Sequence, residues 1–242
     1  MALLLCLETA TRICSVSLFH DHKMLSVRES DVQNIHSAKL TVFIEEVLKE
    51  SGTLYHELDA VAVSMGPGSY TGLRIGVATA KGLCYSLGKP LVAVPTLQAM
   101  AFGMAGYEAF LPVNAKASPV LFCPMIDARR MEVYCGLYDQ ENREVREVKA
   151  EIIDENSFSE FLQKQIVVFG GDGAGKCREV LGGHPNAVFA GNFGASALFM
   201  HQIVRRRMAA GQLEDVAYFE PFYLKEFVAG KPLVKGLRPT RN

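Results

Sequence analysis

The chain has 242 residues, 49% of them apolar, and its 25 lysines and arginines nearly balance its 26 aspartates and glutamates. A chain of this length and composition can bury a proper core, which excludes a largely disordered or low-complexity protein. The net charge of -1 provides no global attraction for nucleic acid. RNA binding would therefore need a local basic patch or a partner protein.

Two further features predict a cytoplasmic protein without a membrane span. The apolar start at residues 3–7 follows no basic stretch, and no apolar run approaches the ~18 residues that cross a bilayer. The six cysteines form no C-x-x-C pair, which favours reduced, buried thiols over a disulfide framework. They are Cys6, Cys14, Cys84, Cys123, Cys135 and Cys177.

The first half of the chain predicts three strands, a helix, a strand, a helix and a strand, in that order. Short apolar runs bounded by turn residues predict the strands, and apolar residues at helical spacing predict the helices. The predicted strands are residues 3–7, 15–19, 24–28, 59–65 and 91–94, and the predicted helices are residues 37–50 and 71–87.

The second half repeats this order with different residues. Its predicted elements are strands at 120–126, 132–138, 144–149 and 166–169, a helix at 157–163, and a glycine-rich turn at 170–175 that enters another helix. Residues 102–119 contain glycines and prolines and are interpreted as the connecting region. The predicted domains are 1–106 and 107–242, the second with a late helix at 195–210 and a tail that lies back over the first.

The strongest local motif is SMGPGSYTGLRIG at residues 64–76, where a strand leads through glycines into a helix. Backbone N–H groups and the positive end of the helix would face an anion at such a turn. The spacing matches neither the dinucleotide-binding fingerprint nor a P-loop, so a purely structural turn is the main alternative.

Two acidic residues, Glu8 and Asp127, end matching strands in the two halves. Carboxylates at strand ends that face a cleft can hold a metal–phosphate complex, although they also cap their own turns. The candidate nucleotide or phosphate residues are therefore Glu8, Thr9, Thr11, Gly66, Gly68, Ser69 and Asp127.

The helix at 71–87 has a small-residue ridge, in which every fourth residue lacks a bulky side chain. The ridge consists of Gly72, Gly76, Ala80, Cys84 and Gly88. Such a ridge lets a neighbouring backbone approach closely, and the neighbour is either the protein's own sheet or helix or a second subunit. In the second case Leu73, Val77 and Tyr85 would flank the contact.

Three other patterns favour structural interpretations. Residues 170–176 fit G-x-x-x-x-G-K, but Cys177 stands where a P-loop needs a hydroxyl for magnesium, so a helix-capping turn is favoured. No two histidines are spaced three or four apart, as a helical zinc pair requires. The basic run Arg205, Arg206 and Arg207 and the basic tail indicate a solvated face, with RNA contact as the alternative.

Five motifs together resemble the TsaB (YeaZ) family, and they span nearly the whole chain. They are LCLETA at 5–10, the 64–76 motif, PTL at 95–97, IDARRMEVY at 126–134 and PFYLK at 221–225. The resemblance implies an α/β fold of the ASKHA (actin/Hsp70/sugar-kinase) class, with two RNase H-like βββαβα domains. This fold agrees with the duplicated order of elements.

The resemblance also implies a role in forming N6-threonylcarbamoyladenosine (t6A) beside the anticodon of tRNAs that read codons starting with A. In that scheme TsaB is the non-catalytic partner of the TsaD transferase subunit, assisted by the ATPase TsaE, and tRNA binds through the complex. Pairing uses the helices of the first domain. The expected interface residues are His36, Leu40, Gly72, Leu73, Gly76, Val77, Ala80 and Cys84.

The sequence departs from the catalytic paralogue at two positions. TsaD-type proteins carry an H-x-x-x-H metal pair, whereas the helix that starts at His36 has Leu40 in the second place, and Glu8 stands where ASKHA kinases have Asp. We therefore expect no catalytic residue, no metal and no tightly bound cofactor, with ATP or ADP at a subunit boundary as a candidate ligand.

Two enzymatic alternatives and one alternative partner follow from the same fold. The chain would be an ATP-dependent phosphotransferase if Glu8, Asp127 and the two glycine-rich turns surround a nucleotide. It would be a peptidase if the older glycoprotease (M22) label of this wider family applies. A second copy of the chain is the alternative partner, because a free apolar ridge tends to associate with itself.

Overall fold

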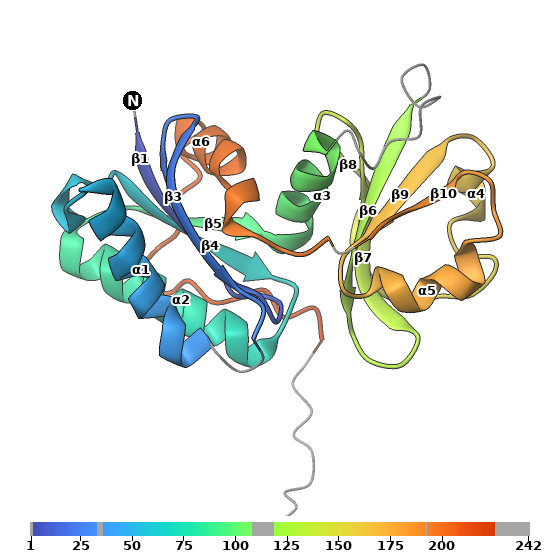
Figure 1. The fold of residues 1–242 in the computed structure, drawn as a ribbon, viewed down its shortest axis with the longest axis horizontal. Coiled ribbons are helices and arrows are strands. Elements are labelled where there is room, and N and C mark those ends of the chain that lie inside the picture. Colours follow the sequence, from blue (N-terminus) through green and yellow to red (C-terminus); the bar gives the residue numbers. More distant parts are fainter. Residues whose placement is uncertain (1, 33–35, 108–118, 192, 226–242) are drawn as a thin grey trace, which may run out of the picture.

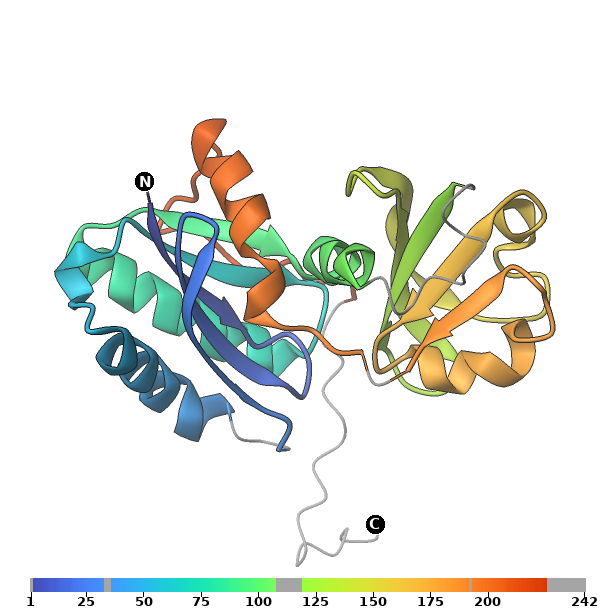
Figure 2. The same ribbon diagram turned by 45° about the horizontal axis from the view of Figure 1, so that its top comes forward.

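The structure is a computed structural model that describes residues 2–32, 36–107, 119–191 and 193–225. Two α/β domains lie side by side, each built on a five-stranded mixed sheet (Figures 1 and 2). The sheet orders are β3-β2-β1-β4-β5 and β10-β9-β6-β7-β8. In each sheet three antiparallel strands are followed by two parallel ones. This duplicated topology confirms the fold class expected from the sequence.

The elements of the first half agree closely with the predicted order. They are β1 (Leu3–Glu8), β2 (Cys14–His20), β3 (Lys23–Ser30), α1 (His36–Ser51), the 3₁₀ helix η1 (Tyr55–Glu57), β4 (Ala60–Gly66), α2 (Tyr70–Leu87), β5 (Leu91–Pro95) and α3 (Thr96–Gly106). β1 is central in its sheet and its residues 4–8 are buried, which explains its nearly continuous apolar sequence.

The second half contains the second sheet and, at its end, a helix that returns to the first sheet. Its elements are β6 (Val120–Asp127), β7 (Glu132–Tyr138), β8 (Glu144–Ile152), α4 (Ser159–Leu162), β9 (Ile166–Gly170), α5 (Ala174–Leu181), β10 (Ala187–Ala190), the 3₁₀ helix η4 (Ala197–Phe199) and α6 (His201–Ala209). No helix among the described residues is both long enough and apolar enough to cross a membrane.

Helices cover both faces of each sheet. α1 and α2 lie on one face of the first sheet, where the apolar stripe of α1, including Leu40, Ile44 and Val47, enters the core. η4 and α6 cover the opposite face. α3 packs on the second sheet and lies between the two domains (Figure 2), while α4 and α5 cover the far face of the second sheet.

The predicted helix at 195–210 is wrong in its first part, because α6 begins only at His201. Both backbone groups of Ala197 are held against β2: its N–H donates to Ser15 Oγ (3.0 Å), and its carbonyl accepts from Ser17 Oγ (2.9 Å). Ser196 Oγ in addition accepts from Leu198 N (3.1 Å). These bonds keep the chain beside β2 as the short η4 before the α-helix starts.

Two other elements differ from the prediction. Residues 102–106 of the predicted connecting region belong to α3, which is buried on most sides between the domains and therefore has no amphipathic period. The rest of that region, residues 108–118, lies outside the described residues. β10 has only four residues and no alternating pattern. Residues 226–242 of the predicted tail also lie outside the described part of the chain.

Two glycines of the α2 ridge allow the helix to pack directly against the end of β1. A Cβ at Gly72 would overlap the carbonyl oxygen of Thr9, and a Cβ at Gly76 would overlap the Thr9 hydroxyl. Gly82 of the same helix is exposed, and a Cβ there would meet open space. The ridge is therefore a contact within the protein, while Gly82 lies on the solvent side.

Alanine substitutions at these two helical glycines should shift stability in opposite directions. Gly82→Ala should raise the free energy of unfolding by ~0.5–1 kcal/mol, because it removes a flexible residue from a helix interior without a clash. Gly76→Ala should lower it by ~1–3 kcal/mol, because the added methyl overpacks against Thr9. Urea denaturation of both variants measures the effect, and stabilisation by Gly76→Ala would contradict the described packing.

Candidate functional site

The space between the two domains contains two neighbouring cavities. One, the Phe189 cavity, has a volume of about 460 Å³, and the other, the Tyr223 cavity, about 510 Å³. Both are lined by residues of the two domains, and they share Thr11, Arg12 and Asp172. Together they form an interdomain cleft, which is the part of this fold best suited to a small ligand.

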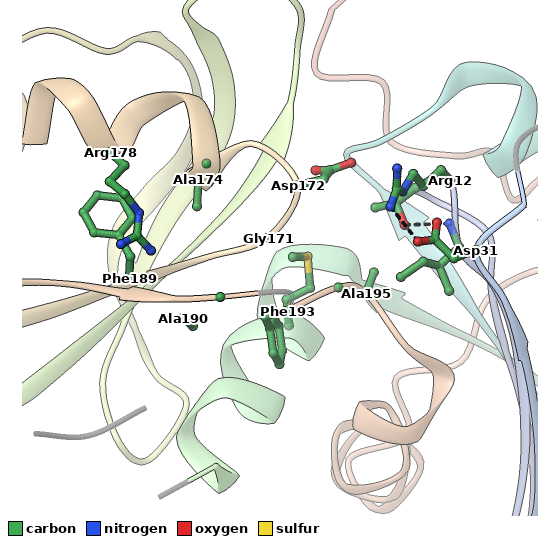
Figure 3. Close-up of a pocket in the computed structure, with 16 residues that line it drawn as sticks. Arg12, Asp31, Gly171, Asp172, Ala174, Arg178, Phe189, Ala190, Phe193 and Ala195 are labelled. Carbon is green, nitrogen blue, oxygen red and sulfur yellow. Dashed lines mark hydrogen bonds and ion pairs between the residues drawn. The ribbon is translucent and has the colours of Figure 1, made fainter. Parts of the chain in front are cut away.

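The Phe189 cavity combines apolar walls with two arginines (Figure 3). Arg12 pairs with Asp31 of its own domain at 2.5 Å, and Asp172 faces this pair from the glycine-rich turn of the second domain. Arg178 lies over the ring of Phe189, with its guanidinium carbon 4.9 Å from the ring centroid. Both guanidinium groups are therefore already engaged within the chain.

The Tyr223 cavity contains the N-terminus of α2. Gly68, Ser69 and Thr71 line it, and Ser69 caps the helix because its Oγ accepts from Gly72 N (3.2 Å). Asp127 at the end of β6 and Lys225 line it from other sides. The cavity thus brings together a helix N-terminus, hydroxyl groups and side chains of both charges.

Asp127 is neutralised by an internal cation. Lys176, in the turn that resembles a P-loop, forms an ion pair with Asp127 and donates to the carbonyl of Glu132 (2.7 Å). Partial burial raises the pKa of Asp127, but the bonds from Lys176 and from Arg129 N outweigh it and leave the pKa lowered. Lys176 therefore binds the end of β6 and the start of β7 within the chain. This agrees with the structural interpretation of the glycine-rich turn.

Glu8 is buried behind the cleft and does not line either cavity. Its Oε1 accepts from Ala10 N (2.6 Å), and Ser64 supplies a second hydrogen bond to the carboxyl group. Burial raises the pKa of Glu8 to about 7, despite the opposing effect of these hydrogen bonds. The carboxyl group is therefore bonded to its own turn rather than presented to a ligand.

The structure brings together only part of the predicted phosphate set. Thr11, Gly68, Ser69 and Asp127 line the Tyr223 cavity, whereas Glu8, Thr9 and Gly66 are buried outside both cavities. Among the described residues, no group of three or more His, Cys, Asp or Glu side chains is placed to hold a metal ion.

The eight predicted interface residues are all buried inside the chain, so the predicted interface needs correction. Even the side chain of His36 is only 8% exposed, and its Nε2 lies 3.3 Å from Ile13 O. The predicted interface residues are buried in the first domain and are therefore not offered on its surface. The residues are His36, Leu40, Gly72, Leu73, Gly76, Val77, Ala80 and Cys84.

The side of α2 that faces solvent offers a different surface, which we call the outer α2 face. It consists of Thr71, Ile75, Ala78, Gly82 and Tyr85, with the exposed Arg74 at its edge, where the guanidinium donates to the hydroxyl of Tyr70 (2.8 Å). Ala78 and Gly82 have little or no side chain, and Tyr85 is 86% exposed. A helix can approach such a face closely, because nothing bulky separates the two backbones along its middle.

The sequence predicts a tail that lies back over the first domain, but it does not predict the contacts of the segment at 210–225, which we call the strap. It pairs with the edge of the first sheet through Glu214 N and Leu91 O (2.9 Å) and reaches β4 through Phe222 N and Met65 O (2.7 Å). It ends at the cleft, where Lys225 pairs with Glu132 of the second domain. The PFYLK motif lies in this segment, but its contacts are distant in sequence and leave no local signal.

Comparison with known proteins adds an independent finding. A family model described as TsaD, tRNA N6-adenosine threonylcarbamoyltransferase, matches residues 28–221. The tRNA threonylcarbamoyladenosine biosynthesis protein TsaB of Haemophilus influenzae is 36% identical over 131 residues, which cover 54% of this chain and 51% of that protein. The TsaB protein of Escherichia coli is 34% identical over 143 residues, or 57% and 55% of the two chains.

The chain spans about half the length of these curated relatives. Among solved structures, YeaZ from Pseudomonas aeruginosa is similar over 93% of this chain and 100% of its own, with a TM-score of 0.79 and 25% identity. The similarity in sequence is thus partial, while the similarity in fold covers both domains.

The pKa of Glu8 predicts a specific pH dependence of stability. Because its folded-state value is about 7 and its usual value is 4.5, the folded state binds a proton that the unfolded state releases between these pH values. Stability should therefore fall as the pH rises from about 4.5 to about 7 and then change no further. Glu8→Gln should remove this loss, which amounts to roughly 3 kcal/mol at most.

Urea denaturation at pH 5 and pH 8 measures the difference for wild type and variant. Glu179→Gln, which changes an exposed glutamate of α5, is the matched control and should keep the wild-type pH dependence. Parallel pH profiles for wild type and Glu8→Gln would show that Glu8 does not carry this linkage.

Proposed function

Because the chain belongs to the tRNA N6-adenosine threonylcarbamoyltransferase (TsaD) family, in its TsaB (YeaZ) branch, we propose that it is a non-catalytic partner subunit of a TsaD-type transferase. In this role it acts in forming N6-threonylcarbamoyladenosine on tRNA. The observation that carries the proposal is its kinship with TsaB proteins, which are named for the biosynthesis of this nucleoside.

The outer α2 face is the surface that we assign to the transferase subunit. Its middle is formed by Ala78 and Gly82, the exposed ring of Tyr85 stands at one end, and its charged neighbour Arg74 lies at the edge. Tyrosine is enriched among the residues that contribute most to protein interfaces. The buried ridge supports this assignment indirectly, because its contact with Thr9 seats α2 so that the opposite side faces outward.

The cleft supports a non-catalytic role more than a phosphotransferase. A magnesium ion that accompanies phosphates would need free carboxylate oxygens, but Glu8 is buried against Ala10 N, and Asp127 is paired with Lys176. This donor set does not fit a metal–nucleotide complex as it stands. A metal-dependent peptidase role has less support. In the resemblance, TsaD-type proteins have their second metal-binding histidine at the position of Leu40, and Leu40 is buried in the core here.

The remaining parts of the proposal follow from family membership. We propose that the complex works in the cytoplasm, that a TsaE-type ATPase assists it, and that tRNA is bound by the complex rather than by this chain alone. A homodimer through the outer α2 face is the alternative state in the absence of the transferase subunit. ATP or ADP at a subunit boundary is the corresponding candidate ligand.

A bulky charge on the outer α2 face should prevent pairing with the TsaD-type subunit. Gly82→Arg places a long cation where a Cβ meets open space, so the fold should be retained. The apparent Kd should rise on the order of 100-fold or more, because a charged side chain would be buried in the interface without an ion partner. Analytical ultracentrifugation of the two chains together measures the association.

Gly175→Arg is the matched control, because Gly175 is also exposed, helical and free of neighbours at its Cβ position but lies on α5 of the second domain. It should pair like wild type. If wild type does not pair at all, the partner-subunit proposal fails. Magnesium-dependent ATP turnover by the isolated wild-type chain would then favour the phosphotransferase.

A further inference from the structure

Three segments lie in order across one face of the first domain. α1 lies over β2 and β3, and α2 lies mainly over β4 with further contacts to β1 and β5. The strap lies at the β5 edge, because Glu214 pairs with Leu91 there. Since β5 ends the sheet, the order is α1, α2 and strap, and the outer α2 face lies between the other two (Figure 1).

The strap is attached to the side of α2. Lys81 Nζ donates to the carbonyls of Ala217 (3.1 Å) and Phe219 (3.0 Å), on either side of Tyr218. Further along, the rings of Tyr223 and Tyr70 lie with centroids 4.9 Å apart. The strap therefore runs antiparallel to α2, from the level of Lys81 to the level of Tyr70 at the helix start.

The backbone around Tyr218 is fixed by its own turn. Asp215 Oδ1 accepts from Ala217 N (2.7 Å) and Tyr218 N (3.2 Å), and Asp215 O accepts from Phe219 N (2.8 Å). Phe219 is buried among the core residues beneath α1 and α2. The backbone at Tyr218 is thus held by the hydrogen bonds to Asp215 and by the burial of Phe219, so it does not need to be ordered when a partner binds.

Tyr218 itself is 83% exposed, almost as much as Tyr85 at 86%. Tyr85 is one helical turn beyond Lys81, which is the residue that binds the backbone on both sides of Tyr218. Two large aromatic side chains on adjacent, ordered segments are therefore almost fully in water. Exposed aromatic residues of this kind mark an interaction surface, because burying them releases much apolar area at a low entropy cost.

We propose that the strap is part of the surface that binds the TsaD-type subunit, with Tyr218 as an anchor beside Tyr85. The inference rests on the proposed function and extends its surface beyond the helices. The continuity of Tyr218 with the outer α2 face carries it, together with the rigid support of the strap. Lys81 acts as a positioning residue, since it holds the strap against α2.

Removal of the Tyr218 ring should weaken pairing with the TsaD-type subunit without changing the fold. Tyr218→Ala should raise the Kd about 30-fold, the effect of losing one interface anchor, and Tyr218→Phe should stay close to wild type because it keeps the ring. Ile152→Ala is the control, because Ile152 is 71% exposed on β8 of the other domain. Ultracentrifugation of the full chains gives the Kd and the partner identity.

The role of Lys81 is tested by a double-mutant cycle. Lys81→Ala should weaken pairing in the wild-type background and have little further effect in Tyr218→Ala, because both changes remove the same anchored ring. An equal loss in both backgrounds would overturn the positioning role. Unchanged pairing of Tyr218→Ala would overturn the strap proposal.

These outcomes are separable from failure of the proposed function. Pairing that is lost in Gly82→Arg but kept in Tyr218→Ala leaves the outer α2 face intact as the site and removes only the strap. Wild type that forms no heterodimer removes both. A wild-type homodimer that Tyr218→Ala dissociates, without any heterodimer, would assign the surface to a second copy and overturn the proposed occupant.

Discussion

The contact between Thr9 and α2 is the constraint on which the rest of the first domain depends. Gly72 and Gly76 leave room for the backbone and hydroxyl of Thr9, so the helix lies directly on the end of β1. A helix seated this closely has no freedom to rotate, because any rotation would drive a larger side chain into Thr9. The same seating aims Ser69 at the cleft and turns Gly82 toward solvent. One internal contact therefore orients both candidate surfaces of the protein.

The strap connects these two surfaces. Its backbone lies largely outside the sheet and cannot satisfy its carbonyls in a ladder, so it depends on side-chain donors. Lys81 supplies one near Tyr218, and at the other end Lys225 reaches Glu132 across the cleft. A single segment thus contacts α2, the Tyr223 cavity and the second domain.

Sequence reasoning predicted elements with a clear period and failed where burial removes the period. The apolar stripe of α1 and both ends of β7 were predicted well. α3 was missed because it is buried on most of its surface between two sheets. The small-residue ridge was recognised, but its occupant was not: Leu73, Val77 and Ala80 lie on the same side of the helix, which is a signal that the ridge faces inward. The tail was expected to lie back over the first domain, but the contacts of the strap were not predicted, since its partners are distant in sequence.

The two carboxylates at the strand ends are both bonded to groups of the chain itself. Glu8 turns back to its own backbone at Ala10, and its burial favours the protonated form near neutral pH. Asp127 forms an ion pair with Lys176. In a phosphate site, a lysine at this place would instead have to be free to bind the phosphate. Each group is satisfied within the chain, so binding a metal–nucleotide complex would first require breaking these bonds. In the cleft, Glu8 and Asp127 are thus bonded within the chain, whereas Gly82 on the outer α2 face has open space beside it. A surface whose groups are not bonded within the chain is the better candidate for binding a partner. We therefore expect the partner to bind at the outer α2 face and the strap rather than in the cleft.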